Sequence, residues 1–472
     1  MPNRRKLLLA AGLSSCALPC VQAARQPKQP HVVVIGAGGA GLAAAAEAAR
    51  CGALVTVLEK QNAVGGDTLI SGGFYAAVDP KRQIPQGISD SIERFTADIL
   101  ESGGDKSDPR LAQILARGAG AMLEQLESLG MRFQPDVIEI YGAHWPRCHK
   151  PMMPNGVGYI QALHSEALRR GAQIRTNCQV TGLILNPAGN VSAVRYTSHK
   201  KIYKMRANAV IIASGGFGAN TKMVARYQPK LAMLTTDNTP GSTGEMLEIA
   251  VRDCRAKLID MAEIQCLPGC PADRKHRVRL HNDVSRFIFV DPSGRRFCRE
   301  DERRDAVLSL PGGIAYSITD AAGLRSYDIL IQKEAVLGVE TGDAWSSSTL
   351  EGLAKMMKLP PKAVVSAVAD YNDGVRRKCD RFGKSPRELR HLIVEPPFWG
   401  CYAAMTIHYT MGGLKISPQA QVLDDADQII PGLYAAGEAA SGIHGINRMG
   451  ANGINDALVF GTIAGREAAL CG

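Results

Sequence analysis

The stretch that decides the fold runs from His31 to Glu59 and reads HVVVIGAGGAGLAAAAEAARCGALVTVLE. It opens with a short apolar, β-branched run at residues 31–35, which is typical of a buried parallel strand. A glycine-rich turn, an alanine-rich helical run at 42–50 and a second apolar run at 54–58 follow. This order predicts a βαβ unit, and therefore an α/β fold with a parallel sheet.

The turn of this unit has the spacing of a dinucleotide-binding fingerprint. Gly36, Gly38 and Gly41 form G-x-G-x-x-G, which allows a tight turn, close approach of backbone N–H groups to a pyrophosphate, and close packing of helix on strand. Glu59 ends the second strand, where a carboxylate accepts hydrogen bonds from ribose hydroxyls. A glycine-rich turn without nucleotide is the alternative, but the complete unit favours a dinucleotide.

A second glycine-rich loop directly after the acid favours a flavin over a nicotinamide. Lys60 leads into Gly66-Asp67-Thr68 and then Ser71-Gly72-Gly73. In flavoproteins with a two-dinucleotide-binding fold, the backbone of this loop lies along the ribityl chain and the ring. Two later apolar runs, at 209–216 and 431–438, end in small residues and are expected to return to the same cofactor. We therefore predict FAD.

The amino-terminal residues 1–23 have the features of a twin-arginine export signal. Arg4, Arg5 and Lys6 precede an apolar run at 7–13, and a small-residue cleavage site ends at Ala23. The apolar run is too short to span a bilayer, although an uncleaved anchor is the alternative. We expect a periplasmic protein without a stable membrane span after cleavage, and a linker at 24–30.

Cysteine usage and charge limit the partners. Of 12 cysteines, Cys16 and Cys20 lie in the signal. The sequence leaves undecided whether Cys266 and Cys270 form a disulfide. No Cys-x-x-Cys-His motif occurs, so we expect no covalent c-type haem, and no metal site is predicted. The formal net charge of +10 falls to about +7 without the signal, which favours an anionic substrate or acidic partner as much as a solvated basic surface. No segment resembles a nucleic-acid-binding module.

The hydrophobic pattern divides the mature chain into two domains. Residues 31–262 and 408–472 are expected to form the FAD-binding domain, and residues 263–407 an inserted capping domain that folds over the flavin. Helical patterns occur at 89–129, 159–170, 350–357 and 362–378. Strands are predicted around Ile174, at 180–184 and at 191–196, and these three are expected to form one meander.

Several longer motifs carry a resemblance to a known family over essentially the whole mature chain. They are GAGGAGLAAAAEA, EKQNAVGGDT with SGG, IIASGGFGAN, TPGSTGE, GRRFCREDERRD, HYTMGG, GLYAAGE and HGINRMGANGINDALVFG. With these motifs the chain resembles the flavoproteins of the fumarate reductase and succinate dehydrogenase superfamily. The likeness is closest to the soluble, exported flavocytochrome c fumarate reductases and their urocanate, methacrylate and cinnamate reductase relatives.

The resemblance implies a reaction and a set of substrate-binding residues. In the family, flavin N5 delivers a hydride to an alkene carbon conjugated to a carboxylate, and an arginine protonates the neighbouring carbon. Arg304 occupies the place of that acid, and His408 and Arg448 match the residues that bind the substrate carboxylate. Each of the three also has an alternative role outside the reaction. Arg304 could be a surface arginine and His408 a core histidine, and Arg448 could contact the flavin diphosphate or the C-terminal helix.

The glycine motifs together with the resemblance imply the FAD-binding residues. These are Gly36, Gly38, Gly39, Ala40, Gly41, Glu59, Lys60, Gly66, Asp67, Thr68, Ser71, Gly72, Gly73, Val180, Ala213, Gly215, Gly244, Glu245, Gly437, Glu438, Arg448, Ala451 and Ile454. The loop after Gly66 has Asp67 and Thr68 where membrane-complex relatives carry a histidine, so the FAD is expected to be non-covalent. Electrons are expected from a separate c-type cytochrome or another periplasmic donor.

Departures from the family pattern bear on the substrate. Fumarate-specific members carry a histidine for the second carboxylate where this chain has Leu267, and an ungapped reading puts Leu280 and Asp283 at the positions of the proton relay. Because Leu267 cannot donate a hydrogen bond, a buried second carboxylate would lack a partner. The sequence therefore predicts reduction of the C=C bond of an α,β-unsaturated carboxylate other than fumarate.

Three alternatives stay open. Arg274, Lys275, Arg277 and Arg279 offer a displaced anion contact that would restore a dicarboxylate such as fumarate. The same fold hosts dehydrogenases, which need an acidic or tyrosine base near the flavin. The third alternative is an electron-transfer subunit of a larger complex.

The sequence also leaves undecided how a proton reaches Arg304, and His281 and Asp283 are the candidates for this relay.

Overall fold

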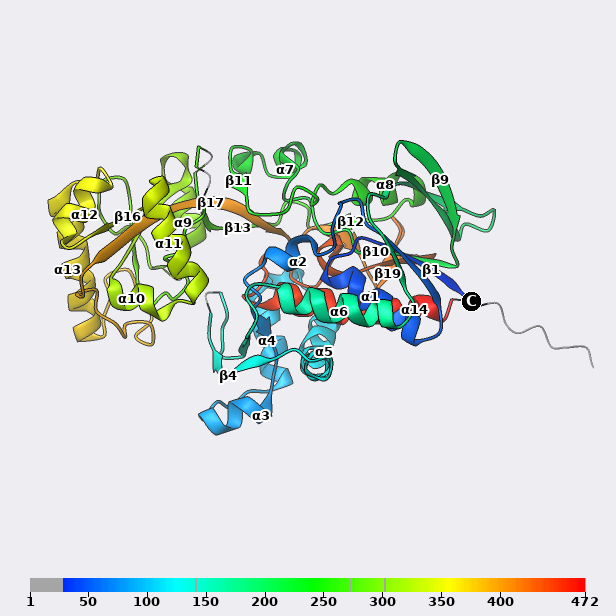
Figure 1. Ribbon diagram of the computed structural model, residues 1–472, viewed down its shortest axis with the longest axis horizontal. Coiled ribbons are helices and arrows are strands. Elements are labelled where there is room, and N and C mark those ends of the chain that lie inside the picture. The colour runs from blue at the N-terminus through cyan, green and yellow to red at the C-terminus, as the bar shows by residue number, and fades with distance from the viewer. Residues whose placement is uncertain (1–28, 141, 272, 275, 301–302, 472) are drawn as a thin grey trace, which may run out of the picture.

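The computed structural model describes residues 29–140, 142–271, 273–274, 276–300 and 303–471 (Figure 1). The predicted export signal and most of the linker lie outside these residues. Two lobes are visible, and the larger contains the central sheet and both described ends of the chain.

A six-stranded sheet forms the centre of the larger lobe. The βαβ unit lies in its middle, because β1 pairs in parallel with both β2 and β10. Only the edge strand β19 runs antiparallel to its neighbour. In spatial order the strands are β19 (Gln421–Leu423), β20 (Ile429–Ala435), β10 (Ala209–Ile212), β1 (His31–Ile35), β2 (Leu54–Leu58) and β6 (Gln173–Arg175).

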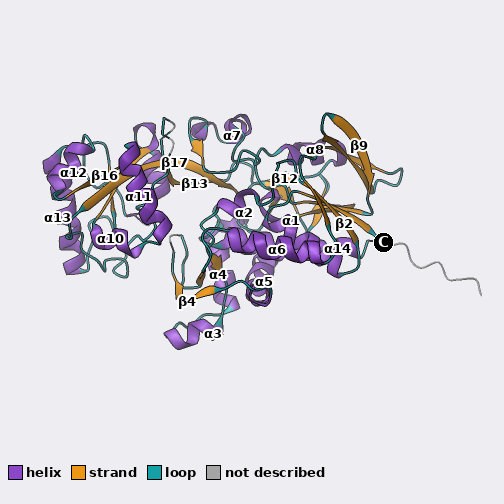
Figure 2. Cartoon of the chain, in the orientation of Figure 1, coloured by secondary structure: helices purple, strands orange, loops and turns teal. Residues whose placement is uncertain are grey.

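The helices beside this sheet pack closely on one another because small residues line their contacts. Helix α1 lies against α14 and α6 (Figure 2). At Gly461 and Gly465 of α14, an added Cβ would approach the carbonyl oxygens of Ala40 and Ala44 within 2.5 Å and 2.3 Å. The helices of this lobe are α1 (Gly39–Arg50), α2 (Gly66–Ile70), α3 (Pro80–Gln83), α4 (Ile92–Ser102), α5 (Pro109–Ser128), α6 (Val157–Arg169), α7 (Thr221–Tyr227), α8 (Glu245–Cys254) and α14 (Asn452–Ala469).

The predicted meander is partly wrong. The strand at Ile174 is β6, which pairs with β2 in the central sheet. The third strand of the meander is β9 (Lys201–Arg206), which follows β7 (Gln179–Leu185) and β8 (Val191–Ser198). Strand β9 escaped prediction because it lies at the sheet edge and nearly all of it is exposed, so its sequence lacks a regular alternation of apolar and polar residues. Two small sheets complete this lobe: β3 (Tyr75–Ala76), β5 (Cys148–Pro151) and β4 (Phe133–Ile138), and β12 (Leu258–Ile259), β18 (Gly413–Lys415) and β21 (Ala440–Ser441).

The smaller lobe has its own sheet and hydrophobic cores and is yellow-green in Figure 1. Strand β17 (Phe398–Thr410), in orange, runs from this lobe into the larger one and pairs with β13 (Ile264–Gly269). The proposed boundary at 407 therefore falls within a continuous strand. Strand β11 (Thr235–Thr236) pairs with the other end of β17 and lies beside α7 in Figure 1. The other elements of the smaller lobe are β14 (Ile288–Val290), β15 (Ile314–Thr319), β16 (Ala344–Ser347), α9 (Arg303–Leu308), α10 (Ala321–Ser326), α11 (Ile329–Thr341), α12 (Leu350–Met356) and α13 (Pro361–Arg377).

Candidate active site

A cavity of about 930 Å³ lies where these elements meet. One group of lining residues comes from β1, β2, α1, α2 and the loops that follow them. A second group comes from the β13–β17 ribbon, from the segment between β13 and β14, and from the start of α14. The cavity is therefore built by both lobes.

The nucleotide side of the cavity is the start of helix α1. Its N-cap, Gly38, has no side chain to cap the helix, and the N–H of Gly39 donates to the hydroxyl of Thr68 at 3.2 Å. Gly36 has a φ of +102°, and a Cβ there would lie 2.4 Å from the carbonyl oxygen of Ala213. The positive end of the helix at the cavity wall fits a dinucleotide pyrophosphate.

The acid at the end of β2 is also in place. Glu59 is 8 % exposed and accepts hydrogen bonds from the backbone N–H groups of Ala37 at 2.7 Å and Gln61 at 2.8 Å. These bonds hold the carboxylate at the cavity wall, where its remaining lone pairs can accept from ribose hydroxyls.

The structure brings nearly all of the predicted FAD-binding residues to the cavity wall. Gly41 and Gly244 are the exceptions among them. A Cβ at Gly41 would lie 1.9 Å from the carbonyl oxygen of Gly36, and one at Gly244 would lie 2.6 Å from Cβ of Phe217, so both positions serve close packing. The predicted residues on the wall are Gly36, Gly38, Gly39, Ala40, Glu59, Lys60, Gly66, Asp67, Thr68, Ser71, Gly72, Gly73, Val180, Ala213, Gly215, Glu245, Gly437, Glu438, Arg448, Ala451 and Ile454.

Glu438 is held against the cavity by β17. Its Oε1 accepts hydrogen bonds from the backbone N–H and the hydroxyl of Thr410, at 2.8 Å and 2.9 Å. Burial, with a smaller contribution from the negative charge of Asp67, raises the pKa of Glu438 to about 8. At neutral pH this carboxyl is therefore mostly protonated, and can donate one hydrogen bond as well as accept.

Arg448 is a buried cation without a carboxylate partner. Its side chain donates to Oε1 of Gln265 at 2.6 Å and to the carbonyl oxygen of Met449 at 3.0 Å. Its guanidinium lies 4.7 Å from the ring centroid of Tyr409, and its Nε is buried without a hydrogen-bond partner. Among the side chains that the structure describes, none makes an ion pair with it. Burial lowers its pKa, which an anion in the cavity would oppose.

His408 lies on β17, and its Nδ1 is 2.9 Å from Oδ2 of Asp237. The same oxygen of Asp237 lies 2.5 Å from Nη1 of Arg277. Burial by itself would raise the pKa of Asp237, but the charges and hydrogen bonds of His408 and Arg277 outweigh it and lower the pKa to about 2. Asp237 is therefore ionised and shared between two cationic or donor side chains.

The other cations on the described wall are paired with carboxylates. Nε of Arg279 donates to Oε2 of Glu334 at 3.0 Å. Lys60 makes an ion pair with Glu245.

The remaining predicted residues divide into those on the cavity and those away from it. Leu267 lines the wall on β13. Leu280 and His281 are buried, and Asp283 bonds to Ser285; none of the three belongs to the described lining. The side chain of Arg304 lies outside the described residues, but its helix, α9, reaches the wall through Ala306.

Sequence reasoning missed two residues of the site. Asp237 and Gln265 each contact a predicted substrate-binding side chain. No local spacing identifies them, because Asp237 is 171 positions from His408 and Gln265 is 183 positions from Arg448. The structure has no disulfide between Cys266 and Cys270, since Cys270 carries a free thiol.

Comparison with known proteins identifies the family. The protein family described as "FAD binding domain" matches residues 31–454 of this chain. The chain belongs to the FAD-binding flavoproteins of the fumarate reductase and succinate dehydrogenase family. It is 33 % identical to a probable fumarate reductase of Shewanella frigidimarina, over 95 % of this chain and 76 % of that one. It is 34 % identical to a urocanate reductase of Eggerthella lenta, over 93 % and 74 % of the two chains.

A solved structure gives the same result for the fold. The open conformation of a flavocytochrome c3 fumarate reductase superposes with a TM-score of 0.77 at 31 % identity, over 94 % of this chain and 79 % of that one. The predicted fold class, an FAD-binding α/β domain with a capping domain, is confirmed. The protein is an FAD-dependent oxidoreductase that acts on C=C bonds.

In the described part of the chain, no helix is both long and apolar enough to cross a membrane.

Glu438 generates a prediction about stability and pH. Because its pKa is about 8 in the folded protein and near 4.5 when unfolded, only the unfolded chain releases this proton between these values. Stability should therefore fall as pH rises from 4.5 to 8, by on the order of 5 kcal/mol. In flavin-free Glu438→Gln this fall should be absent, as measured by thermal unfolding at several pH values. Parallel curves for the two proteins would show that Glu438 ionises normally.

Proposed function

We propose that this protein reduces the C=C bond of an α,β-unsaturated acid that carries a single carboxylate. The observation that carries the proposal is the charge balance of the cavity wall. Of the described cations on that wall, Lys60, Arg277 and Arg279 are each paired with a carboxylate of the protein, and Arg448 is not. One unpaired buried cation provides for one substrate carboxylate.

Arg448 and His408 would bind this carboxylate and withdraw charge from the alkene. When bound, FAD supplies the hydride. As the hydride adds, negative charge develops on the carbon next to the carboxylate and spreads onto its oxygens. Arg448 and His408 would stabilise this charge more strongly than the ground state, which lowers the barrier.

Arg304 is the proposed proton donor. Its helix borders the cavity through Ala306, consistent with the place that the family motif gives it. A guanidinium releases its proton reluctantly, so transfer must be concerted with hydride addition and the proton must be replaced at once. Asn282 reaches the wall close in sequence to the weak relay candidates His281 and Asp283.

The wall disfavours the alternative substrates and reactions. A second carboxylate near Leu267 would meet the guanidinium of Arg277 or Arg279 only if that arginine left Asp237 or Glu334, and either loss costs free energy. A dehydrogenase would need a base, but Tyr409 on the wall donates its hydroxyl to Asp456 at 3.2 Å, and burial raises its pKa well above 10. The urocanate reductase relative fits a substrate with one carboxylate.

We also propose how FAD is attached, where the protein is located and what supplies its electrons. Asp67 binds the backbone N–H of Thr239, and the loop at 66–68 has no histidine, which supports non-covalent FAD. The export-like residues 1–23, cleaved near Ala23, support a periplasmic location. The net positive charge suits docking of a separate c-type cytochrome as electron donor.

Anaerobic reoxidation of the reduced protein tests the reaction. Fumarate, urocanate, cinnamate, methacrylate and itaconate are supplied at equal concentration, and the return of oxidised-flavin absorbance is followed. At least one monocarboxylate should react faster than fumarate by more than about tenfold. Arg448→Gln should slow that reaction by more than about a hundredfold. Arg252→Gln, outside the cavity, is the control. Reoxidation by none of the acids would contradict the proposal.

Arg304→Ala should remove the proton donor. We expect turnover of the best enoate to fall on the order of a thousandfold, because general acid catalysis is lost. Binding of the saturated product should change little, as measured by calorimetry. Arg295→Ala, in the same arginine-rich segment, should keep full activity. Turnover that survives in Arg304→Ala would assign the acid elsewhere.

Leu267→His should change substrate choice. An imidazole at this position offers a donor to a second carboxylate, so the ratio of kcat/KM for fumarate to that for the best monocarboxylate should rise by about tenfold or more. Leu267→Met keeps the wall apolar and should leave this ratio unchanged. An unaltered ratio in Leu267→His would show that Leu267 does not face the distal end of the substrate.

A further inference from the structure

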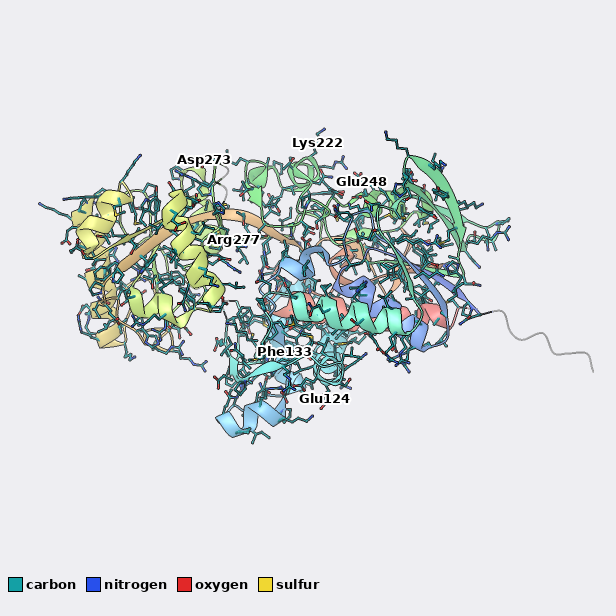
Figure 3. The ribbon with its side chains drawn as sticks, in the orientation of Figure 1. Glu124, Phe133, Lys222, Glu248, Asp273 and Arg277 are labelled. Atoms are coloured by element: carbon teal, nitrogen blue, oxygen red, sulfur yellow. The ribbon has the colours of Figure 1, made fainter. Side chains whose placement is uncertain are left out.

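Asp237 lies at the junction of three segments that are far apart in the sequence. It directly follows β11, which pairs in parallel with β17, and its backbone N–H donates to the carbonyl oxygen of Ile407 at 3.1 Å. This pairing puts Asp237 beside His408. Arg277 comes from the segment between β13 and β14 and is labelled in Figure 3, beside the β17 ribbon.

The carboxylate of Asp237 fixes the orientation of the His408 ring. Its two oxygens lie 2.9 Å and 3.1 Å from Nδ1 of His408. An ionised carboxylate only accepts hydrogen bonds, so Nδ1 carries a proton and donates it. Nε2 is then the ring nitrogen that remains for a ligand in the cavity.

The same carboxylate also neutralises Arg277. Besides Asp237, the Arg277 guanidinium donates to the carbonyl oxygen of Pro268 at 3.1 Å, and its Nε is buried without a hydrogen-bond partner. Both residues line the cavity, and the side chain of Asp237 is only 13 % exposed. Arg277 is therefore a cation at the substrate wall whose charge is already compensated.

We propose that Asp237 is both the positioning residue for His408 and the counter-ion that withholds Arg277 from the substrate, so that the site accepts one carboxylate and rejects two. This inference rests on the proposed function, because it names the substrate class of the same site. A dicarboxylate would bring its second charge to a wall where Arg277 is engaged and Leu267 offers no donor. With Asp237 neutral, Arg277 would become available to that charge.

Calorimetric titration of the FAD-loaded protein with butyrate and succinate tests this without turnover. The two acids have the same four-carbon chain and differ by one carboxylate. The wild-type protein should bind butyrate more tightly. In Asp237→Asn, which keeps the size of the side chain, the affinity ratio should shift towards succinate by at least about tenfold, because the second carboxylate gains Arg277 as a partner.

Two further variants show whether Arg277 causes the shift. Arg277→Gln removes the cation and should not raise succinate affinity. The Asp237→Asn and Arg277→Gln double variant should lose most of the shift seen in Asp237→Asn. Asp253→Asn, a carboxylate paired with Arg252 outside the cavity, should leave the ratio unchanged.

The outcomes separate this inference from the proposed reaction. Equal weakening of both acids in Asp237→Asn would mean that the ion pair only holds the fold, and would overturn the inference. A shift that persists in the double variant would overturn it as well. A clear shift in a protein that reoxidises with none of the enoates would contradict the reaction and leave the charge selection by Asp237 standing.

Discussion

Close contact between backbones is the constraint on which this structure depends. The turn before helix α1 passes the backbone of Ala213 at Gly36, and α1 meets α14 at Gly461 and Gly465, at separations that a side chain would prevent. These contacts hold the start of α1 at the cavity wall, where the positive end of a helix favours an anion. Even a methyl group added at each contact would force the helix away from this position.

On the substrate side, the cavity is organised around the buried guanidinium of Arg448. Taking this charge out of water is unfavourable, and its close contacts are the neutral Gln265, the carbonyl of Met449 and the ring of Tyr409, with no described carboxylate in an ion pair with it. A buried cation without an ion-pair partner favours the binding of an anion, because the anion supplies the missing counter-charge. If Arg448 binds the substrate carboxylate, as we propose, the binding energy comes from this uncompensated charge.

The two lobes share the substrate side. Gln265 and Leu267 on β13 and His408 on β17 lie on the ribbon that joins the lobes, whereas Arg277 comes from the segment that follows β13. The ion pair between Arg277 and Asp237 therefore connects that segment to the loop after β11. Both partners of this ion pair line the cavity.

The sequence by itself determined the features whose chemistry is local. Strands β1 and β2, the glycine turn and Glu59 lie within thirty residues, and their spacing is sufficient to build a nucleotide site. Arg304, His408 and Arg448 followed from a resemblance in motifs, not from spacing. Only the tertiary structure decided that β6 joins the central sheet, because its three residues are too few and too polar to specify a partner strand. It also decided that Arg277 and Arg279 are neutralised, because ion pairing depends on the distance between side chains that the chain separates by 40 and 55 positions.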